Sequence, residues 1–438
     1  MQILKFGGTS VGSAARMKSL TALITKNAPN IVVLSAMSGT TNALLEISNL
    51  ISKSKLDEAL TKIEELQSKY LHEISQLYSE NETIDKAHKV IELQFDSIRA
   101  FLSDVYSVSI EKNIIAKGEV LSTTLFHLYL EEIGVSAVLL SALDFMRIDE
   151  NNEPDLAYIE SNLKRILAKH AENTLFITQG FICRNHFGEI DNLKRGGSDY
   201  TASLIGAALD AENIQIWTDI DGMHNNDPRI VEKTHPIDRL SFNEAAELAY
   251  FGAKILHPTC ILPAQKKNIP VHLLNTMQPT AKGTIISDET SAGAIKAVAA
   301  KDGITAINIK SDRMLMAYGF LRSVFEVFER FKTPIDMITT SEVALSLTID
   351  NDTNLHNILE ELNSIGHVTV DREQTIICIV GDFSGEKAGY ASQVFEALKT
   401  IPIRMISYGG SNNNISVLVE SSYKKDALIS LNQGLFNY

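Results

Sequence analysis

The sequence has few cysteines and no long apolar run. Its three cysteines, Cys183, Cys260 and Cys378, lie far apart without CxxC or metal-ligand spacing, which makes a zinc site unexpected and suits a reducing compartment. No uninterrupted apolar run approaches the roughly 18 residues of a membrane span, and the opening "MQILKFGG" lacks a secretory signal pattern. We therefore expect a cytoplasmic protein without a membrane partner.

Basic residues are also in short supply. The chain of 438 residues carries 40 Lys and Arg against 54 Asp and Glu, for a formal charge of −14. Such an acidic protein is a poor candidate for phosphate-backbone binding, so we expect no nucleic-acid partner and a local basic site for any anionic ligand. The length predicts two or three domains.

The first part of the chain, residues 1–285, alternates short apolar runs with helical patterns. The runs "QILKF", "NIVVLSA", "VSAVLLS", "NTLFITQG", "NIQIWTD" and "IPVHLLN" are predicted to be strands. Their continuous apolar character is typical of strands covered on both faces in a mainly parallel sheet, which predicts an α/β fold. Residues 52–108 are strongly helical and charged and predict a solvated helical excursion without chemistry.

After an expected linker at "PTAKGTIISDETSAG", the chain contains an internal repeat. "VFEVFERFKTPIDMI" begins at Val324 and "VFEALKTIPIRMI" begins at Val394, each read as a helix followed by strands. The pattern predicts two ferredoxin-like βαββαβ modules. The second copy lacks the last strand of the module, and residues 294–302 are the best-placed segment to supply it. We therefore expect a first module at 303–374, inserted within a second module formed by 294–302 and 375–438.

Glycine-rich or charged segments follow four of the predicted strands, at the sheet edge where α/β proteins bind ligands. "KFGGTSVGS" is either a plain turn or a loop that lets backbone N–H groups and Lys5 face a polyphosphate. "KRGGSDYTA" is either helix capping by Ser198 or Asp199, or an anion site in which Arg195 grips a carboxylate. For each of these two motifs, the sequence alone leaves both interpretations open.

Three further segments also allow either a purely structural or a ligand-binding interpretation. "WTDIDGMHNNDPR" is either turn punctuation or a place where Thr218 and Asp219 meet a nucleotide. In "FGAKILHP", Lys254 either lies in solvent or supplies a second positive charge to the phosphates. In "AKGEVLST", Glu119 either serves a helix dipole in a first turn or meets an amino group.

These motifs together resemble the aspartokinases of the amino acid kinase family. "KFGGTSVG", "SAMSGTTN", "KGEVLST", "RGGSDYTA", "WTDIDGM", "DPR" and "FGAKILHP" occur in that family's order, and the C-terminal half looks like paired ACT modules of monofunctional, lysine-sensitive members. Because the sequence stops at Tyr438, we expect no homoserine dehydrogenase region. The resemblance implies a three-layer α/β/α kinase domain and two ACT modules, in a homodimer or a dimer of dimers.

The resemblance also implies phosphorylation of the β-carboxylate of L-aspartate by ATP with Mg²⁺. An aspartate carboxylate, with a usual pKa of about 3.9, is ionised at neutral pH and needs no general base. The implied catalytic residues are Lys5 and Asp199. The implied substrate ligands are Ser35, Thr41, Glu119, Arg195, Gly196, Gly197 and Ser198. The implied nucleotide ligands are Lys5, Gly7, Gly8, Ser10, Thr218, Asp219, His224, Arg229 and Lys254, and no metal ligand is assigned. His224 stands where relatives commonly have tyrosine.

The repeat itself indicates where an effector binds. Aligned, the two modules set Asp336 of "PIDMI" opposite Arg404 of "PIRMI". An effector's ammonium group is attracted by an acid and repelled by an arginine, so the first module is expected to hold the site. The resemblance favours lysine as effector, although Ala317 replaces a serine found in lysine-sensitive relatives. The implied contacts are Met314, Gly319, Phe320, Leu321, Asp336, Thr340, Ser341 and Glu342.

Three alternatives remain at the level of sequence. A sister kinase would act on another carboxylate, a carbamate or a nucleotide, but Glu119 and Arg195 and the paired modules speak against it. A non-catalytic amino acid sensor would retain the fold, and loss of Lys5 or Asp199 would favour this alternative. Both residues are present, which speaks against it. The two modules could also serve only as dimer contacts.

Overall fold

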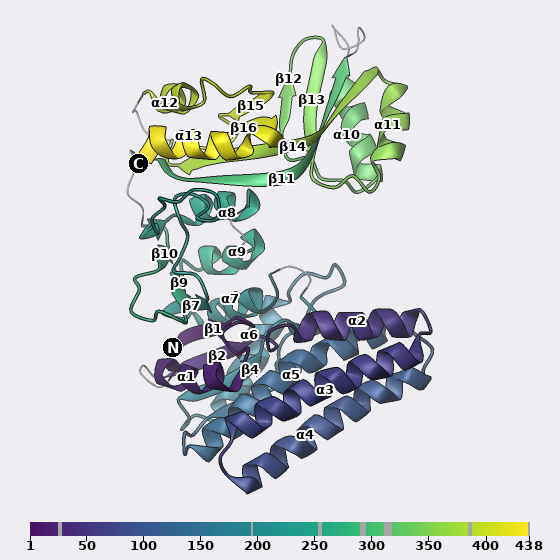
Figure 1. Cartoon of the computed structure of the whole chain (residues 1–438), viewed down its shortest axis with the longest axis vertical. Coiled ribbons are helices and arrows are strands. Elements are labelled where there is room, and N and C mark those ends of the chain that lie inside the picture. The colour runs from purple at the N-terminus through teal and green to yellow at the C-terminus, as the bar shows by residue number, and fades with distance from the viewer. Residues whose placement is uncertain are drawn as a thin grey trace. The chain divides into compact units, whose positions relative to one another are not determined.

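The computed structural model describes residues 1–24, 29–193, 196–252, 256–289, 295–310, 318–383 and 388–436. The chain forms two compact units (Figure 1). The first comprises Met1–Met223, Asp238–Phe242 and Leu256–Asp288, and the second comprises His224–Ile237, Asn243–Ile255 and Glu289–Tyr438. Two segments inside residues 1–285 therefore group with the C-terminal part of the chain.

The first unit is built on a mainly parallel eight-stranded sheet, in the order β3-β4-β2-β1-β7-β9-β10-β8. All neighbouring strands run parallel except β9 and β10. The strands are β1 (Gln2–Phe6), β2 (Asn30–Leu34), β3 (Val138–Leu140), β4 (Leu175–Gln179), β7 (Asn213–Thr218), β8 (Arg239–Leu240), β9 (Val271–Asn275) and β10 (Thr284–Ile286). A separate antiparallel hairpin joins β5 (Ile182–Arg184) and β6 (Ile190–Asn192).

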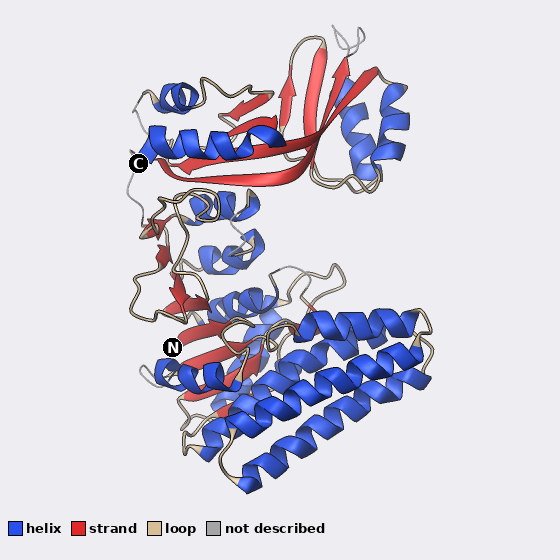
Figure 2. Cartoon of the chain, in the orientation of Figure 1, coloured by secondary structure: helices blue, strands red, loops and turns tan. Residues whose placement is uncertain are grey.

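Helices cover both faces of this sheet, which gives the expected three layers (Figure 2). Leu4 and Phe6 of β1 share a core with α1 to α5, whereas Ile3 lies against α7. Successive side chains of a strand point to opposite faces, so the two sets of helices lie on opposite sides. The helices are α1 (Ala14–Ile24), α2 (Thr40–Ser52), α3 (Leu56–Leu77), α4 (Asn81–Ala100), α5 (Val108–Glu132), α6 (Leu156–Ala168), α7 (Gly197–Leu209) and α9 (Pro258–Lys266).

The six predicted strands are confirmed, and two other expectations are wrong. The expected linker contains β10, whose residues Thr284–Ile286 pair with β9 and β8 and belong to the first sheet. The helical excursion is not simply solvated, because α3 and α4 each bury an apolar face. Tyr70 of α3 packs edge to face on Phe95 of α4, with ring centroids 6.1 Å apart. Amphipathic spacing, rather than charge content, decided this outcome.

The second unit contains a six-stranded antiparallel sheet in the order β12-β13-β11-β14-β16-β15. Two long strands, β11 (Ile295–Lys310) and β14 (His367–Gly381), pair along their lengths at its centre. The other strands are β12 (Ile338–Thr340), β13 (Ala344–Ile349), β15 (Met405–Tyr408) and β16 (Asn414–Glu420). Its helices are α8 (Phe242–Tyr250, whose first residue belongs to the first unit), α10 (Phe320–Arg330), α11 (Leu355–Asn363), α12 (Tyr390–Ala397) and α13 (Lys424–Phe436).

Each long strand contributes to two separate hydrophobic cores. Ile307 and Ile309 of β11 pack with α10 and α11, whereas Val298 of the same strand packs with α12 and α13. The strands bend between these halves, where the register shifts and both Gly303 and Glu373 adopt positive φ angles of 74° and 54°. The module boundaries at 302/303 and 374/375 stay a prediction.

Candidate active site

The loop after β1 presents free backbone N–H groups. Gly7 donates its N–H to the Trp217 carbonyl of β7 (3.2 Å), but within the described residues the N–H groups of Gly8 and Thr9 make no hydrogen bond. A Cβ on Gly8 would lie 3.0 Å from the Ala36 carbonyl oxygen, so glycine allows the two loops to approach each other. Successive free N–H groups of this kind suit an anion.

Lys5 and Asp199 form an ion pair beside this loop. The Lys5 Nζ atom, near the end of β1, lies 2.6 Å from Oδ1 of Asp199 in the first turn of α7. Oδ1 accepts no directed hydrogen bond within the described residues, so the contact is mainly electrostatic. The N-cap of α7 is Gly196, without a side-chain cap. The capping interpretation of Ser198 and Asp199 is therefore wrong, and Asp199 holds the lysine instead.

Glu119 is a buried carboxylate in the middle of α5. Its side chain is 3% exposed, and Oε1 accepts a hydrogen bond from the Ala36 N–H at 3.3 Å. Oε2 is buried without a hydrogen-bond partner within the described residues. Burial raises the pKa of Glu119 to about 7, since the charged form is poorly solvated. The helix begins at Val108, so the first-turn interpretation of this acid is wrong.

Two serines and a strained residue join the remaining loops. The Ser35 hydroxyl, after β2, donates to the Ser198 hydroxyl at 2.9 Å. Gly180 permits this approach, because a Cβ there would lie 2.3 Å from the Ser198 Cβ. Phe181 follows with φ 67°, a left-handed conformation that is costly for a bulky residue.

The loops that carry these groups line one pocket of about 540 Å³ within the first unit. Lys5 and Asp199 are not among the described lining residues, but a Cβ on Gly7, which lines the pocket, would lie 3.4 Å from the Lys5 Nζ. The pocket brings together the predicted residues Gly7, Gly8, Ser35, Thr41, Glu119, Gly197, Ser198, Thr218 and Asp219. The pocket also includes Thr9, Ala36, Met37, Ser38, Gly39, Asn42 and Phe181, which were not predicted. Most of these belong to the motifs "KFGGTSVG" and "SAMSGTTN", so reading each motif as a whole loop would have found them.

Helix α3 supports the loop between β2 and α2. The Lys69 Nζ donates to the Ser38 carbonyl at 2.6 Å, and the Tyr70 hydroxyl is 3.0 Å from the Thr40 hydroxyl. The Glu73 carboxylate accepts the N–H of Ala14, the first residue of α1. The helical excursion therefore positions one wall of the pocket, a role that its charged sequence did not indicate.

Several predicted residues lie elsewhere. Ser10 is buried outside the pocket lining, with its hydroxyl 2.7 Å from that of Thr276. His224 and Arg229 belong to the second unit, where the His224 Nδ1 lies 3.0 Å from the Thr234 hydroxyl. Arg229 forms a bidentate pair with Asp227 at 2.9 and 2.7 Å. Arg195, Lys254, Met314 and Ala317 lie outside the described residues.

The predicted effector residues divide by exposure. Thr340, Ser341 and Glu342 are exposed around the turn between β12 and β13, and Leu321 is exposed on α10. Gly319 is the N-cap of α10 with φ 90°, and Phe320 is buried. The Asp336 side chain is buried and paired with Lys301 and Tyr250. Neither partner was predicted from the sequence.

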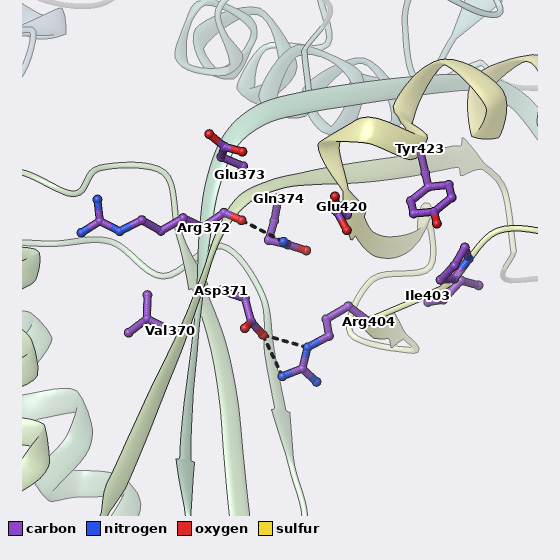
Figure 3. Close-up of a pocket in the computed structure, with 10 residues that line it drawn as sticks. Val370, Asp371, Arg372, Glu373, Gln374, Ile403, Arg404, Glu420 and Tyr423 are labelled. Carbon is purple, nitrogen blue, oxygen red and sulfur yellow. Dashed lines mark hydrogen bonds and ion pairs between the residues drawn. The ribbon is translucent and has the colours of Figure 1, made fainter.

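A second hollow, of about 580 Å³, lies in the second unit beside β14 (Figure 3). Arg404 closes one side with its Nε 2.9 Å from Oδ2 of Asp371, and the Gln374 amide donates to the Arg372 carbonyl at 2.9 Å. The Arg372 side chain points away from Arg404 and Tyr423 (Figure 3). Among the described residues, none of the lining side chains leaves a fully buried polar atom without a hydrogen bond.

The described residues contain no group of three or more His, Cys, Asp or Glu side chains arranged to hold a metal ion. In the described part of the chain, no helix is long and apolar enough to cross a membrane.

Comparison with known proteins places these features in a family. Residues 1–275 match the amino acid kinase family, and residues 377–435 match an ACT domain. The lysine-sensitive aspartokinase 3 of Escherichia coli (strain K12) is 33% identical over 447 residues, which cover 99% of both chains. The chloroplastic aspartokinase 3 of Arabidopsis thaliana is 34% identical over 465 residues, covering 99% of this chain and 81% of that protein.

Solved structures agree along the whole chain. The crystal structure of E. coli aspartokinase III in complex with aspartate and ADP (R-state) matches with a TM-score of 0.87 and 32% identity, covering 100% of both chains. The complex of that enzyme with lysine and aspartate (T-state) matches with a TM-score of 0.81 and 33% identity, covering 100% of this chain and 99% of the other. The chain therefore belongs to the aspartokinases of the amino acid kinase family.

Proposed function

We propose that the pocket of the first unit transfers the γ-phosphoryl group of ATP to the β-carboxylate of L-aspartate, producing 4-phospho-L-aspartate and ADP. In this family the reaction begins the synthesis of lysine, threonine, methionine and isoleucine. One observation carries the proposal: the Lys5–Asp199 pair lies next to the loop whose free N–H groups face the pocket that Glu119 lines.

Phosphoryl transfer to a carboxylate requires positioning and neutralisation of charge rather than a general base. Lys5 offsets negative charge on the transferring group, and Asp199 fixes its ammonium at 2.6 Å. The Gly8 and Thr9 N–H groups donate to phosphate oxygens, as preorganised dipoles that need no reorientation. The attacking carboxylate is already ionised, which explains why no histidine occurs among the described residues that line the pocket.

Substrate choice depends on two charged groups at opposite ends of aspartate. Glu119 accepts the α-ammonium group through its unpartnered Oε2, which relieves the cost of burying that oxygen. Arg195 holds the α-carboxylate as a paired donor. Ser35, Thr41 and Ser198 complete the substrate side, and Gly197 lets the N-terminus of α7 border it.

The nucleotide side fits a magnesium complex of ATP. A bound Mg²⁺ would supply positive charge that offsets the charge of the phosphates, and such an ion usually keeps several waters with one or two protein carboxylates. Asp219 lines the pocket and supplies such a carboxylate, whose Oδ1 accepts the Thr218 hydroxyl at 3.2 Å.

The test is ADP release with Mg-ATP and three acceptors. L-Aspartate should be turned over, L-asparagine should not because it lacks the β-carboxylate, and succinate should react poorly because it lacks the ammonium group that Glu119 receives. Equal rates with aspartate and succinate would favour a sister kinase for another carboxylate. No acceptor-dependent ADP in any reaction would refute the proposal and favour an amino acid sensor.

We further propose that residues 303–374 form a module with an amino acid effector site, and that 294–302 with 375–438 form its partner module in a homodimer or a dimer of dimers. Lysine is the proposed effector, supported by the lysine-sensitive E. coli relative. Asp336→Ala should abolish lysine inhibition and leave turnover near the parental rate. Unchanged inhibition in that titration would refute the assignment of Asp336. Light scattering after gel filtration measures the assembly.

A further inference from the structure

Asp336 already has an ammonium partner from its own chain. It lies just before β12, its backbone N–H donates to the Thr348 carbonyl at 2.9 Å, and its side chain is 1% exposed. The Nζ of Lys301 on β11 lies 2.9 Å from Oδ1 of Asp336 and 2.8 Å from Oδ2 of Asp350. The acid expected to attract an effector's ammonium group is therefore occupied by an internal one.

Tyr250 of α8, in the same unit, encloses this pair. Its hydroxyl donates to Asp336 Oδ1 at 2.5 Å, and its ring centroid lies 4.2 Å from Lys301 Nζ, a cation–π contact. Burial raises the pKa of Tyr250 to about 12, so the hydroxyl keeps its proton as a donor. Burial alone would lower the pKa of Lys301, but hydrogen bonds to Asp350 and Asp336 raise it above its usual value. Lys301 therefore stays a cation.

The second half of the repeat contains the same pair with its charges reversed. Aligning "PIDMI" with "PIRMI" sets Asp336 opposite Arg404, 68 residues later (404 − 336). Each of these residues pairs with an opposite charge on one of the two long strands, Asp336 with Lys301 of β11 and Arg404 with Asp371 of β14. Arg404 and Asp371 form an ion pair with Nε–Oδ2 and Nη2–Oδ2 distances of 2.9 Å, which Figure 3 shows at the edge of the hollow. Those side chains are 45% and 42% exposed, against 17% for Lys301 and 1% for Asp336.

Because the Lys301–Asp336 pair is buried, it should affect the binding of a ligand, whereas the exposed Arg404–Asp371 pair should not. An exposed pair is well solvated whether or not it forms, whereas a buried carboxylate depends on its partner for its charge to be tolerated. Asp336 also retains one buried oxygen, Oδ2, without a hydrogen-bond partner within the described residues. A new ammonium group at Asp336 must therefore compete with Lys301 for a single negative charge.

We propose that Lys301 is a tethered competitor for the effector's ammonium group at Asp336, and so determines how tightly the effector binds. The inference rests on the effector site proposed above for residues 303–374. Asp350 makes the exchange possible, because it already contacts Lys301 and is one-third exposed. Once the effector pairs with Asp336, Lys301 keeps Asp350 as its counter-ion instead of becoming a buried unpaired charge.

Two substitutions should change effector affinity in opposite directions. Lys301→Met removes the competitor and leaves Asp336 in need of a cation, so L-lysine should bind about tenfold more tightly. Asp350→Asn removes the alternative counter-ion and ties Lys301 to Asp336, so L-lysine should bind about tenfold more weakly. A merely structural role for these residues would weaken binding in both variants.

Isothermal titration of the full chain with L-lysine measures this without requiring turnover. Lys424→Met is the matched control, since Lys424 pairs with Asp302 at 2.5 Å in the same unit but does not contact Asp336. Lys301→Arg keeps the charge and should bind close to the parental affinity. If thermal unfolding shows that Lys301→Met does not fold, Tyr250→Phe replaces it, because loss of its hydrogen bond to Asp336 should tighten binding in the same direction.

The outcomes separate this inference from the proposed activity. Tighter binding by Lys301→Met supports the competitor, including the case in which the parent binds no lysine. Equal or weaker binding by that variant overturns it. If neither the parent nor Lys301→Met binds lysine, the inference is overturned. The aspartate-dependent ADP assay tests the kinase reaction independently of this result.

Discussion

The two hollows of the molecule have similar volumes, about 540 and 580 Å³, but very different chemistry. The hollow in the first unit contains a carboxylate oxygen of Glu119 that is buried without a partner, beside N–H groups that make no hydrogen bond within the described residues. In the hollow of the second unit, Asp371 and Arg404 neutralise each other. The comparison teaches that unsatisfied buried groups, rather than volume, indicate where a ligand binds.

The largest effect should follow from removing the cation beside the first hollow. Lys5→Ala should lower kcat about 10³-fold, since a preorganised charge at the transferring group is lost. Steady-state ADP release measures it. Lys112→Ala is the matched control, because Lys112 also pairs with an aspartate in the same unit, Asp191 at 3.1 Å, but has no role in the proposed site. If Lys5→Ala turned over at the parental rate, the first hollow would not differ from the second as a catalytic site.

Glu119→Gln should act on substrate binding. The neutral amide cannot pair with the substrate ammonium, so the KM for aspartate should rise about 10²-fold while the KM for ATP changes little. Measuring both constants in one set of titrations provides the internal control. A fall in kcat with unchanged aspartate KM would place Glu119 in a different role.

The raised pKa of Glu119 gives the parent a pH dependence. Because this pKa is about 7, the carboxylate takes up a proton as the pH falls through 7, and it then no longer attracts an ammonium group. We expect kcat/KM for aspartate to fall about tenfold per pH unit below that point, since this ratio reports the free enzyme. In Glu119→Gln this limb of the profile should disappear.

A smaller loss should follow from disturbing the geometry alone. Gly180→Ala places a Cβ 2.3 Å from that of Ser198, so the start of α7 must shift. We expect kcat/KM to fall about 10- to 100-fold. Gly410→Ala is the control, because a Cβ there meets no atom within 4 Å. Equal activity of the two variants would show that the Ser35–Ser198 contact is not needed.

The smallest effect should come from the second hollow. Arg404→Ala breaks an exposed ion pair, and we expect the free energy of unfolding to change by less than about 1 kcal/mol, with kinetic constants unchanged. Chemical denaturation and the ADP assay measure the two quantities. A large loss in either would show that the hollow contains more than a solvated pair.

The sequence predicted the first sheet well because its strands are continuous apolar runs, such as Ile31 to Leu34, which bury both faces. The strands β5, β8 and β10 were missed, because runs of two or three residues are too short to show a periodicity. The equally short β3 was found because it lies within the longer apolar run "VSAVLLS". Chain order also concealed the grouping of residues 224–237 with the second unit, since contacts between distant segments leave no local pattern.

For the site, motif positions identified which loops meet but not how their side chains pair. Lys5 and Asp199 were both predicted, and their direct contact required the fold to join positions 194 residues apart (199 − 5). The supporting contacts of Lys69 and Tyr70 were invisible because these residues occur in an ordinary amphipathic helix. Likewise, no local pattern links Lys301 to Asp336.

The two long strands of the second unit have a consequence for how the chain folds. β11 and β14 pair from Ile295–Gly381 at one end to Lys310–His367 at the other, and each strand passes through both hydrophobic cores. Neither core can form without fixing part of a strand that the other also requires, so the two cores should unfold in one cooperative transition. Their pairing closes a long loop of chain, which makes formation of this sheet a slow step in folding.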